Sequence, residues 1–91
     1  MTPREAAIDL IRDYVERGVN PRWIRQGGMG SYSDRYHAQI GGYVYSGGIA
    51  TRYGTDKILV TQVHGTVVNA VFSFEDIYDE IASGMTQQSL F

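Results

Sequence analysis

Apolar residues recur with a helical period at both ends of the chain and with a strand period between them. The first apolar stripe has members three or four residues apart: Ala7, Ile8, Ile11, Tyr14 and Val15. Thr2 and Glu5 have the spacing of a capping box around Pro3, a residue favoured in the first turn of a helix. Gly18 suits the left-handed position that follows a helix. The pattern predicts a helix over residues 2–18.

A second, shorter helical signal follows at Asn20–Pro21, which has the residue types of a helix cap and a first helical position. It predicts a single turn through Trp23 and Ile24. The next segment, "GGMGSYSD", is rich in glycine and serine and predicts a mobile loop.

The period changes to two after Arg35, where Tyr36, Ala38 and Ile40 alternate with polar residues. The alternation predicts four antiparallel strands, over residues 36–45, 49–53, 57–63 and 66–72. Their separators are Gly47–Gly48, a turn at residues 54–56 and a two-residue hairpin turn at His64–Gly65. Gly41–Gly42 is consistent either with a break between strands or with a β-bulge.

The last helical pattern begins after Ser73, a capping residue type, and is predicted to end at Ser83–Gly84. Phe74, Ile77 and Ile81 share one face of it. The predicted fold class is therefore α+β, in the order α-β-β-β-β-α, with both helices packed on one face of a four-stranded antiparallel meander. We expect one domain over residues 1–84 and a tail over residues 85–91 that binds a partner.

Composition narrows the functional classes. The 91 residues include no cysteine, which excludes a disulfide framework and thiol chemistry. The N-terminus has no signal-peptide pattern and no segment is long enough to span a bilayer, so we expect a cytoplasmic protein without membrane contact. No spacing of ligand residues indicates a metal site, and we predict no cofactor.

Charge is distributed unevenly along a chain whose net charge is −2. Residues 17–36 contain four arginines and one acid, whereas residues 75–80 contain four acids and no base. Tyrosines lie close to the arginines, and this mixture predicts a face that binds a ligand or partner. Its candidate residues are Arg22, Trp23, Arg25, Tyr32, Arg35, Tyr36, Tyr43 and Tyr45. A nucleotide or single-stranded nucleic acid is one ligand of suitable chemistry, and a bland solvated loop is the alternative.

Catalysis has a weaker basis in the sequence. His37 and His64 are the two histidines, and a metal-free nuclease would need both in one cleft beside a cation such as Arg35. A hairpin turn and the polar face of a strand explain the two residues equally well. We predict that the protein is not an enzyme and keep a two-histidine nuclease as an alternative.

The C-terminal residues Gln87–Gln88–Ser89–Leu90–Phe91 resemble the bacterial sliding-clamp-binding pentapeptide, Gln-Leu-Ser/Asp-Leu-Phe. Four of the five positions match, and Gln88 departs from the usual leucine. The resemblance implies that Leu90 and Phe91 enter an apolar pocket of the clamp, with polar contacts from Gln87 and with Ser89 as the small polar residue. The competing interpretation is that the tail packs on the domain's own sheet.

These observations favour a small non-enzymatic protein that binds a protein partner, for which the sliding clamp is the named candidate. The chain also resembles, in style, the small accessory proteins of phages and mobile elements. That resemblance implies an alternative partner, a host defence complex that an anti-CRISPR-like or nucleotide-sequestering inhibitor would block. A homo-oligomer is left open.

Overall fold

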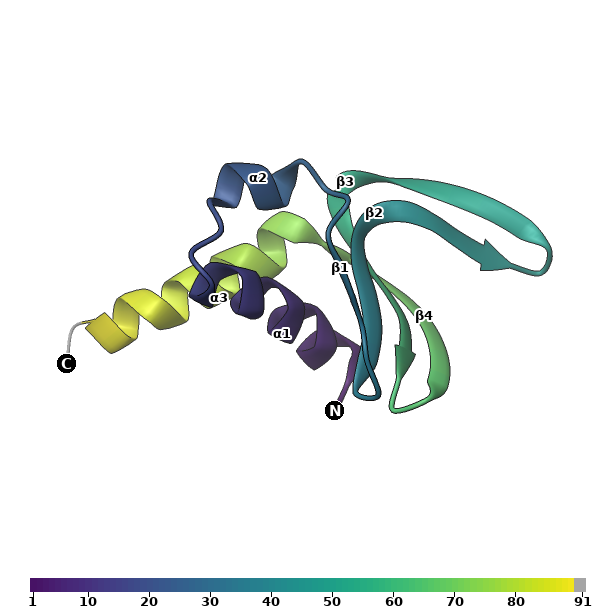
Figure 1. Ribbon diagram of the computed structural model, residues 1–91, viewed down its shortest axis with the longest axis horizontal. Coiled ribbons are helices and arrows are strands. Elements are labelled where there is room, and N and C mark those ends of the chain that lie inside the picture. Colours follow the sequence, from purple (N-terminus) through teal and green to yellow (C-terminus); the bar gives the residue numbers. More distant parts are fainter. Residues whose placement is uncertain (90–91) are drawn as a thin grey trace.

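The structure is a computed structural model that describes the backbone of residues 1–89 and the side chains of residues 1–84. Four strands form one antiparallel sheet in the order β1-β2-β3-β4, and helices precede and follow it (Figure 1). The predicted α+β class and the helix–meander–helix order are confirmed. The elements are α1 (Pro3–Glu16), α2 (Pro21–Arg25), β1 (Gly30–Tyr32), β2 (Tyr36–Ser46), β3 (Ile49–Val63), β4 (Thr66–Ser73) and α3 (Phe74–Ser89).

The first helix has the capping box that its sequence predicts. The Thr2 hydroxyl accepts a hydrogen bond from the Glu5 amide at 3.1 Å, and the Glu5 carboxylate accepts one from the Thr2 amide at 3.0 Å. Both amides belong to the helix end, where no intrahelical partner exists. Gly18 follows the helix with a φ of 80°, a left-handed value that favours glycine.

The core lies between the helices and one face of the sheet (Figure 1). Burying each large aliphatic or aromatic side chain there stabilises the fold by about 1.5–3 kcal/mol. The two long helices contribute Ala6, Ala7, Leu10, Ile11, Phe74, Ile77 and Ile81. The strands contribute Tyr36, Ala38, Ile40, Ile58, Val60 and Val63, and α2 contributes Ile24.

Two predictions about the strands are wrong. The glycine–serine segment that the sequence predicts as a loop contains β1, because its backbone is held from two sides. The Tyr14 hydroxyl donates to the Gly30 carbonyl at 3.0 Å, and the Ile40 amide donates to the Met29 carbonyl at 2.9 Å.

The second error is the turn predicted at residues 54–56, which is part of β3 instead. Ile40 pairs with Ile58 whereas Gly42 pairs with Tyr53, so residues 54–57 lie opposite Gly41 alone. Such a bulge absorbs the extra residues without reversing the chain. The sequence prediction of a bulge at Gly41–Gly42 is therefore the interpretation that the structure supports.

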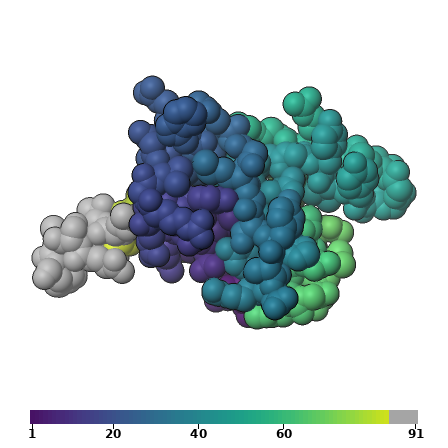
Figure 2. Space-filling view, viewed as in Figure 1, coloured from purple at the N-terminus to yellow at the C-terminus, as the bar shows by residue number. Residues whose placement is uncertain are grey.

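The bulge also bends β2. Gly41 and Gly42 have φ values of 70° and 102°, and beyond them the hairpin leaves the core (Figure 1). We call residues 42–53, with their turn at Gly47–Gly48, the arm. Figure 2 shows the arm in teal standing away from the green β4, with a notch between them.

The last helix is longer than the sequence predicts, since α3 continues past Ser83–Gly84 to Ser89. Gly84 has no left-handed φ and therefore does not end the helix. The predicted tail over residues 85–91 overlaps this helix, and Leu90 and Phe91 lie outside the described residues.

The bend gives a first prediction. A Cβ at Gly42 would lie 2.0 Å from the Gln39 amide nitrogen, whereas one at Gly47 would meet nothing within 4 Å. We expect Gly42→Ala to lower the free energy of unfolding by about 2–4 kcal/mol, from backbone strain and loss of the Gln39 hydrogen bonds. Gly47→Ala, at a φ of 58°, is the matched control and should cost about 1 kcal/mol. Urea unfolding of both variants measures the difference, and equal losses would contradict it.

Candidate functional site

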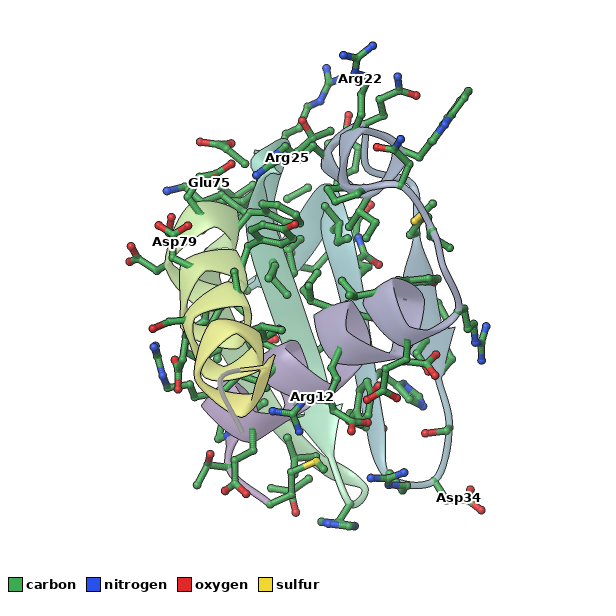
Figure 3. The ribbon with its side chains drawn as sticks, turned by 90° about the vertical axis from the view of Figure 1, so that its left-hand side faces the viewer. Arg12, Arg22, Arg25, Asp34, Glu75 and Asp79 are labelled. Atoms are coloured by element: carbon green, nitrogen blue, oxygen red, sulfur yellow. The ribbon has the colours of Figure 1, made fainter. Side chains whose placement is uncertain are left out.

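The basic and acidic segments of the sequence fold against each other. Arg25 of α2 pairs with Glu75 of α3, with its Nε 2.9 Å from the carboxylate (Figure 3). The guanidinium also lies 4.8 Å from the centre of the Tyr78 ring and 5.5 Å from that of Phe74. The hydrogen bond to Glu75 raises the pKa of Arg25. This arginine connects α2 to α3 and is not free to bind a ligand.

Two further arginines, of which Arg35 belongs to the predicted face, are similarly placed. The Arg35 guanidinium lies 3.6 Å from the Asp9 carboxylate, and Arg4, near the start of the chain, pairs with Glu80. The unbalanced positive charge predicted around Arg25 and Arg35 is therefore largely compensated by acids distant in sequence. Arg22 extends outward from α2, and the ion pairs of the described residues do not include it (Figure 3).

Tyr36 belongs to the core and not to an accessible face, because only 5% of its surface is exposed. This corrects its assignment to a ligand-binding surface. Burial raises the pKa of Tyr36 to about 12, and the neighbouring Asp9 carboxylate acts in the same direction. Asp9 of α1 and Ser31 of β1 are the side chains close enough to act on the pKa of its hydroxyl, so Tyr36 lies where β2 meets α1 and β1.

The remaining aromatic members of the predicted face are exposed but do not form one surface. Trp23 is 60% exposed on α2, and Tyr32 is 65% exposed on β1. Tyr43 and Tyr45 are 52% and 70% exposed on the arm. The structure thus divides the predicted face into three places, and the arm is the one that holds two large exposed rings.

Strand pairing gives the composition of the two arm faces. Tyr43 lies opposite Arg52 and Tyr45 lies opposite Ala50, so these four residues share one face. Ile49, an exposed residue on the other face, lies opposite Ser46. Sequence reasoning missed Arg52 and Ile49, although the strand alternation after the Gly47–Gly48 turn was a usable signal that places them on opposite faces.

The glycine-rich segment borders a pocket of about 280 Å³, whose lining includes Met29, Gly30, Tyr32, Gln39 and Gly42. Among the described side chains, none that lines this pocket is charged. The Tyr32 hydroxyl donates to the Gln39 side-chain oxygen at 2.6 Å, and the Gln39 amide donates to the Gly41 carbonyl at 2.8 Å. The Gly27 and Gly28 amides donate to the carbonyls of Ile24 and Ile40. These uncharged, mutually bonded groups do not provide the cations and free amides that a phosphate requires.

The two histidines have structural surroundings. The His37 and Tyr32 rings form a T-shaped pair, with 5.4 Å between centroids and 71° between planes. His64 lies in the β3–β4 turn with a φ of 49°, and its amide donates to the Arg35 carbonyl. Within residues 1–84, neither histidine side chain pairs with a carboxylate that would orient a general base, and neither contacts a cation that would hold a phosphate.

Two further properties concern residues 1–89 alone. Among them, no three histidine, aspartate or glutamate side chains gather as metal ligands would. The helices of this part of the chain are too short or too polar to cross a membrane. The side chains of Gln87, Ser89, Leu90 and Phe91, which carry the pentapeptide resemblance, lie outside the described set.

Comparison of the chain with protein-family models, characterised proteins and solved structures finds no match. The chain's own surface is therefore the basis on which a function can be assigned.

The burial of Tyr36 predicts how stability depends on pH. Its pKa is about 12 in the folded state against 10.0 for the exposed group, so between these values the unfolded chain loses a proton that the folded protein retains. The stabilisation is complete below pH 10 and is lost as pH rises towards 12. We expect Tyr36→Phe to show a smaller loss of unfolding free energy between pH 9 and 12 than the wild type. Tyr45→Phe, at an exposed site, is the control, and equal pH profiles for wild type and Tyr36→Phe would contradict the assignment.

Proposed function

We propose that this protein is a non-enzymatic binding protein that docks on a protein partner through the arm. The observation that supports this most directly is the exposure of Tyr43 and Tyr45 on a ribbon that stands clear of the core. Side chains that contribute to folding stability would be expected to pack on the helices, as Tyr36 does.

The chemistry of the arm is that of a protein interface. Tyrosine and arginine are over-represented among residues that dominate binding energy, because each offers a large contact area together with polar groups. Arg52 lies directly across the ladder from Tyr43, and the ion pairs of the described chain do not include it. One face of the arm therefore presents two rings and an uncommitted cation to a partner.

The C-terminal resemblance names a candidate for a separate partner, which the C-terminal residues and not the arm would bind. Gln87, Ser89, Leu90 and Phe91 match four of five positions of the sliding-clamp-binding pentapeptide. A short peptide with two apolar anchors is a recurrent way to occupy a groove on another protein. In this proposal the pentapeptide binds the clamp, and the arm is left free for a second contact.

The arm assignment is tested with Tyr43→Ser/Tyr45→Ser. Because both rings are exposed, the free energy of unfolding should change by less than about 0.5 kcal/mol per substitution. A partner other than the sliding clamp that the immobilised wild type captures from bacterial lysate should no longer be captured by this variant. Trp23→Ser removes an equally exposed ring from α2 and should retain the partner. Retention by the arm variant and loss by the α2 variant would reject the arm as the docking element.

The clamp assignment is tested separately with purified bacterial sliding clamp. Leu90→Ala/Phe91→Ala should lose most of the affinity, since the two anchors carry most of the peptide's apolar area. Gln88→Leu should bind more tightly because it restores the usual second residue. The arm variant Tyr43→Ser/Tyr45→Ser serves as the control and should bind as the wild type does. If the wild type does not bind the clamp at about 50 µM, which corresponds to a binding free energy of about −6 kcal/mol, this partner is rejected.

A further inference from the structure

The outer edge of β2 is covered along its first part and then becomes free. β1 pairs with residues 37–39, and Ile40 exchanges backbone hydrogen bonds with Gly28 and Met29. The Gln39 side chain then donates to the Gly41 carbonyl, which covers one further backbone group. Within residues 1–89, the next part of this edge, Gly42–Ser46, has no strand beside it.

This free edge lacks the features that usually prevent strands from adding to one another. Natural edge strands are protected by charged side chains, prolines or bulges. Residues 42–51 contain no charge and no proline, and the bulge lies before them at Gly41. The backbone groups on the outer side of Gly42–Ser46, which belong to every second residue because the others pair with β3, are therefore available to an added strand.

The sequence of the edge is self-complementary. In an antiparallel pair centred on Val44, Tyr43 of one strand faces Tyr45 of the other, and Tyr45 faces Tyr43. We propose that the arm's partner is a second copy of this chain, added edge to edge by antiparallel pairing of β2 with β2 around Val44. This inference rests on the proposed function and names the partner that the arm binds.

The pairing would assemble the exposed rings on one surface. Tyr43 and Tyr45 share a face with Arg52 and Ala50, so the joined arms form a sheet in the order β3-β2-β2-β3 with four tyrosines at its centre. Aromatic pairs on directly opposed strands are favourable contacts. Arg52 of each copy lies on the outer strand, one strand away from the dyad, so no like charges face each other at the junction.

The area available predicts a weak dimer. A tyrosine buries about 150–250 Å² when fully covered. At 52% and 70% exposure, the two tyrosines offer on the order of 250 Å² per copy. A stable interface needs about 800 Å² from each partner, so even with the strand backbones this contact belongs to the small, transient class. We expect dissociation in the range of tens to hundreds of micromolar.

The test uses sedimentation equilibrium of the full chain from about 10 µM to about 1 mM, a range that brackets the expected affinity. The wild type should pass from monomer to dimer. Tyr43→Lys/Tyr45→Lys and Tyr43→Glu/Tyr45→Glu should each be monomeric, because the proposed register places like charges opposite each other. An equimolar mixture of these two variants should form a heterodimer, and Tyr43→Lys/Tyr45→Glu should dimerise with itself.

Circular dichroism and urea unfolding establish that each variant is folded, and Trp23→Lys is the control that should dimerise like the wild type. A wild type that remains monomeric at about 1 mM, beyond the range expected for a weak specific contact, would overturn the proposal. Dimerisation of Tyr43→Lys/Tyr45→Lys in the absence of the glutamate variant would also overturn it. The proposal is likewise overturned if Tyr43→Lys/Tyr45→Glu does not associate while the wild type does. If the wild type is monomeric but arm-dependent capture from lysate persists, the second copy is wrong and the proposed function stands. If the arm substitutions affect neither measurement, both proposals fail.

Discussion

A mismatch of lengths between helices and strands shapes this molecule. The 15 residues of β3 and the 11 of β2 extend for roughly 50 and 36 Å at 3.3 Å per residue. The 14 residues of α1 reach about 21 Å at 1.5 Å per residue. Helices of this length cannot cover both long strands, so the remaining hairpin must pack elsewhere or project. The left-handed glycines Gly41 and Gly42 bend it away from the core, and the arm is the part that the helices leave uncovered.

Most elements of the fold could be predicted from local sequence patterns. The wrong predictions concern segments whose conformation depends on residues distant in the sequence. The capping box of Thr2 and the strand alternation from Tyr36 are short-range signals, and both predicted their elements correctly. The glycine at residue 54 suggested a turn, but its conformation depends on Gly41 in the neighbouring strand. The strand at Gly30–Tyr32 likewise depends on hydrogen bonds from Tyr14 and Ile40, which no local pattern reveals.

The candidate site was predictable in its residue types but not in its arrangement. Tyrosines on alternating positions indicated that some rings leave the core, and Tyr43 and Tyr45 do. The same spacing could not distinguish them from Tyr36, because the β2 residues of the core cluster all lie before the bulge. No local pattern could pair Arg25 with Glu75, because the two residues are 50 positions apart. Charge that looks segregated along the chain is therefore compensated in the folded protein.

The position of the single tryptophan has a spectroscopic consequence. Trp23 lies on a five-residue helix and remains 60% exposed, so its indole is largely in water in the native state. Unfolding then changes its surroundings little, and its emission should follow global unfolding poorly. It should respond instead to events near α2, which the cation–π contacts of Arg25 connect to α3. Fluorescence from this residue is thus a local reporter of α2, whereas far-ultraviolet dichroism follows the whole sheet and its helices.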